Sequence, residues 1–137
     1  MCPRKTIPAL VMLLAGISLF GCGGGGGGGE GAGSGPARTL SWDPPTAFTD
    51  NTPLNPAADL DVFEIYVNET GTFSPSDTAD AAVNAYEPGT GSVNTTFNLA
   101  LLPHSAQDNT LYYVSVRCVA KSGLKSDFSM TASFRYN

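Results

Sequence analysis

The sequence has few of the residues from which catalytic and nucleic-acid-binding sites are built. Its single histidine, His104, lies in a polar stretch after Pro103, and there is no Gly-x-Ser-x-Gly nucleophile elbow, which argues against a Ser-His-Asp hydrolase. Lysine and arginine number seven against 12 aspartates and glutamates, whereas nucleic-acid binding demands clustered cations. We therefore expect neither an enzyme nor a nucleic-acid-binding protein.

Long apolar runs are also missing. The longest run, residues 7–20, has 14 residues, whereas a helix that crosses a bilayer needs about 20. Arg4 and Lys5 precede it without any acid, and this order of positive charge followed by apolar residues is typical of an export signal. We expect a signal peptide that takes no part in the fold.

Four residues at the end of this segment, Leu19-Phe20-Gly21-Cys22, resemble the lipobox of bacterial lipoproteins. In that family the chain is cut before the cysteine, whose thiol carries a diacylglyceryl group. The resemblance implies a signal peptide over residues 1–21, lipidation of Cys22 and attachment to the membrane through this lipid. In this family an aspartate directly after the cysteine retains the protein in the inner membrane. Because Gly23 stands at that position, the resemblance also implies the outer membrane in a bacterium with two membranes. The alternative is an ordinary secretory signal with a structural or free Cys22.

Glycine is concentrated directly after this cysteine. Residues 23–29 are an unbroken run of glycine, and three more glycines follow before Pro36. Such a segment buries no side chains and loses much entropy on ordering, so we expect residues 22–37 to form a flexible tether. A phosphate-binding loop is disfavoured because no Lys-Ser/Thr pair follows. Without residues 1–21 the net charge is −7, which favours solubility.

The remaining residues, 38–137, are enough for one domain with a single core. Short runs of alternating apolar and polar residues are separated by Gly, Pro, Asn and Asp, and no helical stripe of useful length occurs. The pattern predicts an all-β domain. The expected strands are residues 39–42, 62–67, 93–99, 111–120 and 128–136.

Several of these segments resemble strands B, C and F and the F-G turn of a fibronectin type III domain, an immunoglobulin-like antiparallel β-sandwich. The resemblance implies that Trp42 is buried between two sheets, that Tyr112 packs into the core, and that strands C and F are neighbours. The tether lies where strand A should begin, so strand A is expected to be short or missing. The segments are Leu40-Ser-Trp-Asp-Pro-Pro-Thr46, Asp59-Leu-Asp-Val-Phe-Glu-Ile-Tyr66, Leu111-Tyr-Tyr-Val-Ser-Val-Arg-Cys-Val-Ala120 and Ser122-Gly-Leu-Lys-Ser-Asp-Phe-Ser129.

The stretch from residue 69 to residue 92 is the least regular. Phe73, Val83 and Tyr86 are its only large apolar residues. We expect a long connection with one or two short strands, and a helical turn over residues 77–84 is an alternative because Ser76 could cap it.

No set of residues predicts a metal, cofactor or disulfide site. The aspartates Asp43, Asp50, Asp59 and Asp61 lack the spacing of a calcium loop and are interpreted as turn residues. Cys2 would leave with the signal and Cys22 would carry lipid, so Cys118 has no partner. Because Cys118 is in the inward phase of its strand, we expect an inert core thiol.

The outward phase of the same strands gives the candidate binding surface. If Phe63, Ile65, Tyr112, Val114 and Val116 are buried, alternation turns Tyr66, Tyr113, Arg117 and Val119 to the other face of the sheet. Tyrosine and arginine are enriched at binding hot spots. We therefore predict a partner surface at Tyr66, Tyr113 and Arg117, and the alternative is ordinary cross-strand pairing on a solvated sheet.

These features favour a non-enzymatic lipoprotein of the bacterial cell envelope whose fibronectin type III domain binds a protein or acts as a spacer. The alternative is a carbohydrate-binding accessory lipoprotein, which would need exposed aromatic rings in a row. The expected partners are the membrane, through Cys22, and an envelope protein or glycan whose identity the fold does not determine.

Overall fold

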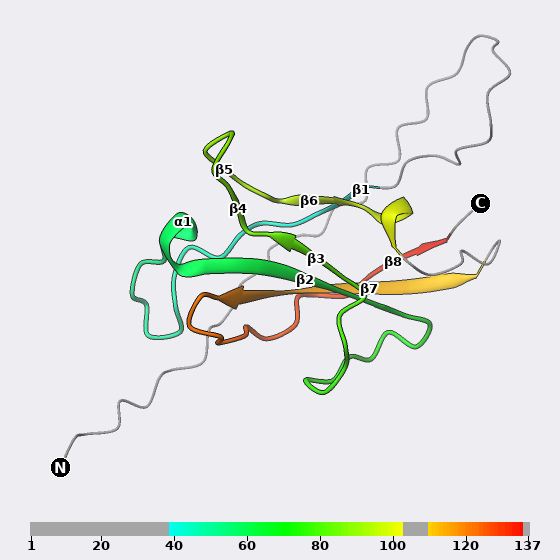
Figure 1. The fold of residues 1–137 in the computed structure, drawn as a ribbon. Coiled ribbons are helices and arrows are strands. Elements are labelled where there is room, and N and C mark those ends of the chain that lie inside the picture. The colour runs from blue at the N-terminus through cyan, green and yellow to red at the C-terminus, as the bar shows by residue number, and fades with distance from the viewer. Residues whose placement is uncertain (1–38, 103–109, 136–137) are drawn as a thin grey trace, which may run out of the picture.

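The computed structural model describes residues 39–102 and 110–135, so Cys22, the tether and His104 lie outside the described residues. The described part is mostly strand with little helix, which confirms the all-β prediction (Figure 1). In chain order its elements are β1 (Thr39–Ser41), α1 (Pro56–Asp59), β2 (Leu60–Asn68), β3 (Ala81–Asn84), β4 (Tyr86–Glu87), β5 (Ser92–Val93), β6 (Thr96–Asn98), the 3-10 helix η1 (Leu99–Leu101), β7 (Leu111–Ala120) and β8 (Ala132–Arg135).

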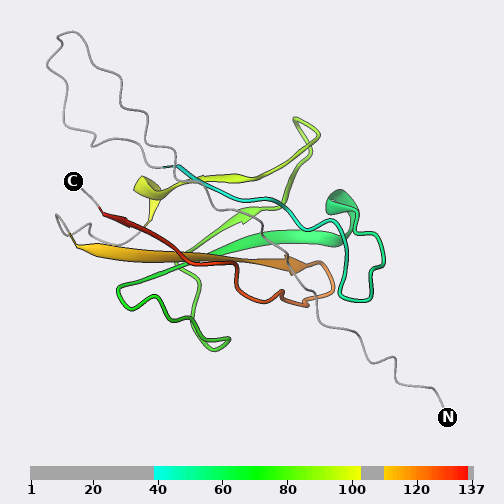
Figure 2. The ribbon, with the colours of Figure 1, turned by 180° about the vertical axis from the view of Figure 1, so that it is seen from behind.

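Three antiparallel sheets make up the fold. The largest has the strand order β3-β2-β7-β8, and the long strands β2 and β7 pair from Leu60 opposite Ala120 to Asn68 opposite Tyr113. The second sheet pairs β1 with β6, and the third pairs β4 with β5. Figures 1 and 2 show β1 and β6 as a layer that lies along one face of the four-stranded sheet. The described residues thus form a β-sandwich-like arrangement.

The core lies between these layers. Leu40 and Trp42 come from the chain of β1, and they meet the inward residues of β2 and β7 in one hydrophobic cluster. The ring of Trp42 packs edge-on against Phe63 with a centroid distance of 5.2 Å. Trp42 is 3% exposed, and Tyr112, which stacks on Phe134, is 5% exposed. The predicted burial of Trp42 and Tyr112 is confirmed.

The stretch from residue 69 to residue 92 forms short strands, and the alternative of a helical turn over residues 77–84 is wrong. Residues 81–84 form β3, which pairs with β2. Asp80 guides this pairing, since its amide donates to Ile65 O and its carboxylate accepts from the amide of Val67. Strand pairing outweighs the helix propensity of the alanines, as tertiary contacts often do.

Helix α1 was not predicted, although its sequence carries a start signal. The side chain of Asn55 accepts from the amide of Ala57, and Pro56 occupies the first helical turn. In turn, the carboxylate of Asp59 accepts a hydrogen bond from the amide of Asn55 at 2.7 Å. This reciprocal capping stabilises a single turn that leads into β2.

The last strand is shorter than predicted. The expected strand covered residues 128–136, whereas β8 begins at Ala132. The residues before β8 form no regular strand, and among them Phe128 packs against Tyr66 of the predicted binding surface.

Replacing Trp42 tests the core. Trp42→Ala should lower the free energy of unfolding by about 3 to 5 kcal/mol, because it empties a large aromatic site between the sheets. Urea unfolding followed by circular dichroism measures the loss. Native Trp42 emission at the wavelength of a solvated indole would contradict the burial on which this expectation rests.

Candidate functional site

The predicted binding surface is the face of the four-stranded sheet that turns away from the core. The alternation is as expected: Phe63, Ile65, Val114 and Val116 belong to the core cluster, whereas Tyr66, Tyr113, Arg117 and Val119 do not. The pairing of β2 with β7 sets Glu64 opposite Arg117 and Tyr66 opposite Ser115. The sheet therefore brings Tyr66 and Arg117 together on this outer face.

The expected exposure of this surface is wrong. Tyr66 is 1% exposed, Arg117 is 8% exposed, and Val119 is also buried. Only Tyr113 keeps part of its surface in solvent. The reason is a second layer that sequence alternation does not reveal. The residues between β7 and β8 run beside β7, and we call residues 124–131 the strap (Figures 1 and 2). Its Phe128 ring contacts Tyr66, Arg117 and Phe73 on the outer face of the sheet.

The strap pairs with β7 in an irregular way. Lys125 bridges Val119, the amide of Ser126 donates to Cys118 O, and the amide of Ser129 donates to Val116 O. Three residues of the strap thus match two residues of β7, which is the geometry of a β-bulge. The bulge places Phe128 opposite Arg117, on the outer face.

Serine hydroxyls complete the hydrogen bonds that this irregularity disrupts. The amide of Cys118 donates to Ser126 Oγ at 3.0 Å, and the amide of Val116 donates to Ser129 Oγ at 2.9 Å. The hydroxyl of Ser115 donates to Ser129 O at 3.0 Å. Ser115, Ser126 and Ser129 are all buried. The hydroxyls of Ser126 and Ser129 therefore satisfy β7 amides, and the hydroxyl of Ser115 satisfies a strap carbonyl, that water cannot reach.

Arg117 lies between the sheet and the strap. Its Nε donates to Ser126 O at 2.8 Å, and its guanidinium carbon is 4.6 Å from the centre of the Phe128 ring. The Phe128 ring also packs edge-on against Tyr66 at 5.0 Å and lies against Phe73 at 5.7 Å. Among the described residues, Arg117 Nη1 has no hydrogen-bond acceptor. The arginine is therefore only partly satisfied in its buried position.

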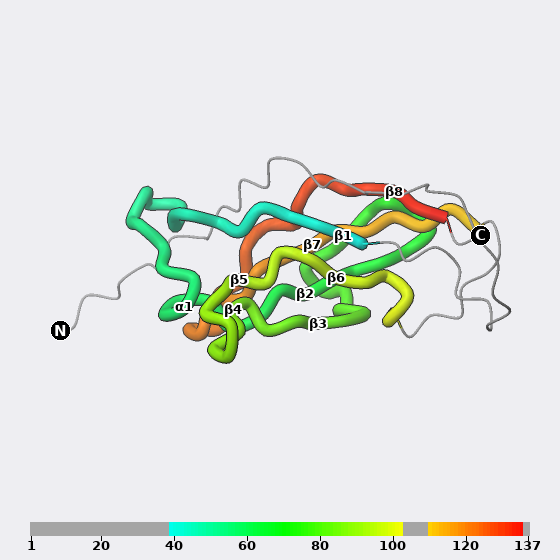
Figure 3. Tube along the Cα trace, turned by 90° about the horizontal axis from the view of Figure 1, so that it is seen from above, coloured from blue at the N-terminus to red at the C-terminus, as the bar shows by residue number. Residues whose placement is uncertain are grey.

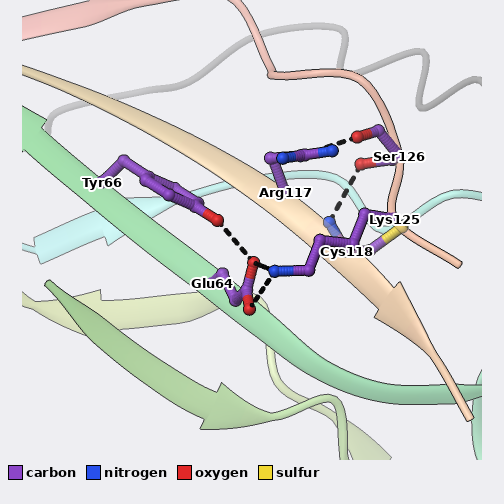
Figure 4. A network of polar contacts seen from close by, with 6 residues as sticks. All are labelled: Glu64, Tyr66, Arg117, Cys118, Lys125 and Ser126. Atoms are coloured by element: carbon purple, nitrogen blue, oxygen red, sulfur yellow. Dashed lines mark hydrogen bonds and ion pairs between the residues drawn. The ribbon is translucent and has the colours of Figure 1, made fainter. Parts of the chain in front are cut away.

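A polar network joins the strap to β2 (Figure 4). Lys125 Nζ lies 2.8 Å from both carboxylate oxygens of Glu64, and the hydroxyl of Tyr66 donates to Glu64 Oε2 at 2.6 Å. Burial and the hydrogen bond to Glu64 raise the pKa of Tyr66 to about 12. Burial acts to raise the pKa of Glu64, but the bonds from Lys125 and Tyr66 and the nearby cations outweigh it and lower that pKa.

Tyr113 is covered by the backbone of the turn after β2. Gly71 has a φ of 74°, and a Cβ placed on it would lie 3.2 Å from the Tyr113 ring. The turn is fixed by Asn68, whose side-chain oxygen accepts from the amides of Thr70 and Gly71. Only glycine combines this conformation with such a close approach to a ring.

The remaining candidates hold the fold together. Cys118 is buried and free, as expected, and burial raises the pKa of its thiol. Asp50 accepts from the amide of Thr52, as a turn residue does. No group of three or more His, Cys, Asp and Glu side chains that could hold a metal ion occurs within residues 39–102 and 110–135. The same residues contain no helix long and apolar enough to cross a membrane.

Comparison with known proteins gives no relative: no family model, no curated protein and no solved structure matches this chain.

Replacing the strap serines tests their role. Ser126→Ala and Ser129→Ala should each lower the free energy of unfolding by about 1 to 3 kcal/mol, because each leaves a buried β7 amide without an acceptor. Urea unfolding gives the values, and Ser133→Ala, an exposed serine on β8, is the matched control. A loss as small as that of the control would mean that the hydroxyls are not needed.

The Glu64 network predicts a dependence on acid. Because the pKa of Glu64 is lowered on folding, its ionised form stabilises the protein above the ordinary value of 4.5, and this contribution is lost as the pH falls through the lowered pKa. Melting temperatures from pH 6 to pH 3 should therefore differ between wild type and Glu64→Gln at pH 6 and converge in acid. Glu87→Gln, at an exposed position on β4, is the matched control. A constant offset between wild type and Glu64→Gln at every pH would contradict the assignment.

Proposed function

We propose that the protein is a non-enzymatic lipoprotein of the bacterial cell envelope, anchored at Cys22, whose fibronectin type III domain binds a protein or acts as a spacer. The observation that carries the envelope assignment is the basic start, the 14-residue apolar run and the Leu19-Phe20-Gly21-Cys22 sequence, followed by a glycine-rich tether. In a bacterium with two membranes, Gly23 favours the outer one.

The strand pairing supports the fibronectin type III part of the proposal. With β1 as strand B, β2 as strand C, β7 as strand F and β8 as strand G, the sheet order β3-β2-β7-β8 agrees with the C-F-G sheet of an immunoglobulin-like sandwich. The separate pairing of β1 with β6 agrees with the other sheet, in which strand B lies beside strand E. Trp42 has the inter-sheet position that the resemblance implies.

The use made of the charged side chains favours binding or spacing over catalysis. Glu64 and Lys125 form an ion pair that holds the strap, and Arg117 is bonded to the strap backbone. Asp59 caps α1, and Asp80 binds the amide of Val67. Each of these groups is committed to a bond that maintains the fold.

Because Tyr66 and Arg117 are covered in this structure, the surface that the closed fold offers to a partner lies at the loops rather than on the sheet. Thr39 pairs with Asn98 at one end of the sandwich, whereas α1 and the turn after β7 lie at the other end (Figures 1 and 3). Lys121, in the turn after β7, links this turn to α1, since its Nζ donates to Ala57 O and its amide donates to Asp59 O. The proposed tether would therefore join the sandwich at the end opposite to α1 and the turn after β7.

The carbohydrate-binding alternative is weaker than the sequence alone suggests. It requires exposed aromatic rings on which a sugar can stack, and Tyr66 is buried against Phe128 instead. Tyr113 is half-buried beside Gly71. We therefore favour protein binding or spacing.

Lipidation at Cys22 gives the direct test. Intact-mass measurement of membrane-extracted protein should give a chain that begins at Cys22 and carries two or three acyl chains, because one chain alone anchors only marginally. Cys22→Ser should release the protein to the soluble fraction, whereas Cys118→Ser should not. Membrane retention of Cys22→Ser, or the mass of an unmodified chain, would refute the anchor.

A further inference from the structure

The strap is longer than the strand that it covers. Between the bridge of Lys125 with Val119 and the pairing of Ala132 with Val114, the strap side advances seven residues while β7 advances five. Two extra residues thus lie in the strap, and the regular ladder is interrupted over this length. The β7 amides of Val116 and Cys118 are bonded to serine hydroxyls rather than to backbone carbonyls.

Few side chains of the strap are buried in an apolar environment. Phe128 is its one large apolar residue on the outer face, and it is only partly buried. Met130 is 72% exposed, and Lys125 and Asp127 are exposed as well. Segments with few buried apolar contacts open at lower free energy than the core.

The closed strap also leaves a charge incompletely bonded. Arg117 is more than nine-tenths buried, yet Nη1 has no acceptor among the described residues. An unsatisfied buried donor destabilises the state that contains it. Opening the strap would hydrate this group, so the open state gains an interaction that the closed state lacks.

We propose that the strap opens as a local unit and that the β7 edge which it vacates is a docking site for an extended, acidic peptide segment of a partner protein. The peptide would lie antiparallel or parallel along residues 115–119 as an added strand. Its carbonyls would accept from the amides of Val116 and Cys118, and a carboxylate would meet Arg117. The proposal rests on the binding role proposed above and names its partner chemistry.

We assign the hinge of this motion to Gly123 and its fixed end to β8. Gly123, in the turn before the strap, has a φ of 85°, and a Cβ placed on it would meet nothing within 4 Å. After the strap, β8 is held by Phe134, which is buried and stacked on Tyr112. The strap can therefore lift while β8 stays paired with β7.

Native-state hydrogen exchange of the full chain tests the opening. The amides of Val116 and Cys118 should exchange at least tenfold faster than the amide of Trp42, which donates to Thr95 O in the core, and with a weaker dependence on denaturant. Ser129→Ala should speed the exchange at Val116 about tenfold further, which corresponds to about 1.4 kcal/mol, and Val116 should still exchange faster than Trp42 and with a weaker dependence on denaturant. Ser133→Ala is the control and should change neither. Exchange of Val116 and Cys118 at the rate and denaturant dependence of Trp42 would mean that the strap opens only on global unfolding, and would overturn the proposal.

A pair of peptides tests the docking. The probe is a fluorescent peptide with the sequence of residues 124–131 carrying the substitution F128E, which puts a carboxylate opposite Arg117, and its control carries F128K. The F128E peptide should bind the full chain saturably and at least tenfold more tightly than the F128K peptide. Equal binding of the two peptides, or no binding of either, would overturn the docking site. Neither readout depends on lipidation of Cys22, so a failure here is distinguishable from a failure of the envelope assignment.

Discussion

β7 is buried on both of its faces, and the rest of the structure depends on how this burial is achieved. From Val114 to Ala120 every residue of the strand is buried. One face needs an apolar core, and the other needs a cover, because a strand in the middle of a sheet also carries backbone groups that must be bonded. The core is provided by the layer of β1 and β6, and the cover is provided by the strap, Phe73 and the turn around Gly71. One face of β7 is thus covered by an apolar core and the other by a mixed layer of aromatic and polar groups.

The inner layer could be predicted from the sequence, and the outer one could not. Alternation along β2 and β7 identifies Phe63, Ile65, Val114 and Val116 as core residues, since side-chain direction in a strand is a local property. Whether the opposite side chains are exposed depends on segments far along the chain. Tyr66 is covered by Phe128, which is 62 residues away, and no local pattern encodes this contact. The signal that was available is the pair Ser126 and Ser129, two small hydroxyl residues where a regular strand would carry larger apolar ones.

Local signals were more informative at the termini of elements than inside the irregular stretch. The Asn55-Pro56 start with Asp59 is a readable capping pattern, and α1 forms there. The alanines before Asn84 also favour helix, but they form β3 because Asp80 joins the chain to the edge of β2. A propensity of a few tenths of a kcal/mol per residue is small beside a set of ladder hydrogen bonds. Cys22, on which the proposed localisation rests, belongs to a part of the sequence that we interpret by its resemblance to export signals rather than by folding.

The two extra residues of the strap determine which face of the sheet each later side chain occupies. Each single insertion in a strand exchanges the two faces for everything that follows it. The first extra residue, before Ser129, brings Phe128 opposite Arg117 instead of into the core. The second, before Ala132, restores the original sense, so that Phe134 again points inward opposite Tyr112. An odd number of insertions would have sent Ser133 and Arg135 into the core and Phe134 into solvent. The chain therefore tolerates its irregular strap only because the count of added residues is even.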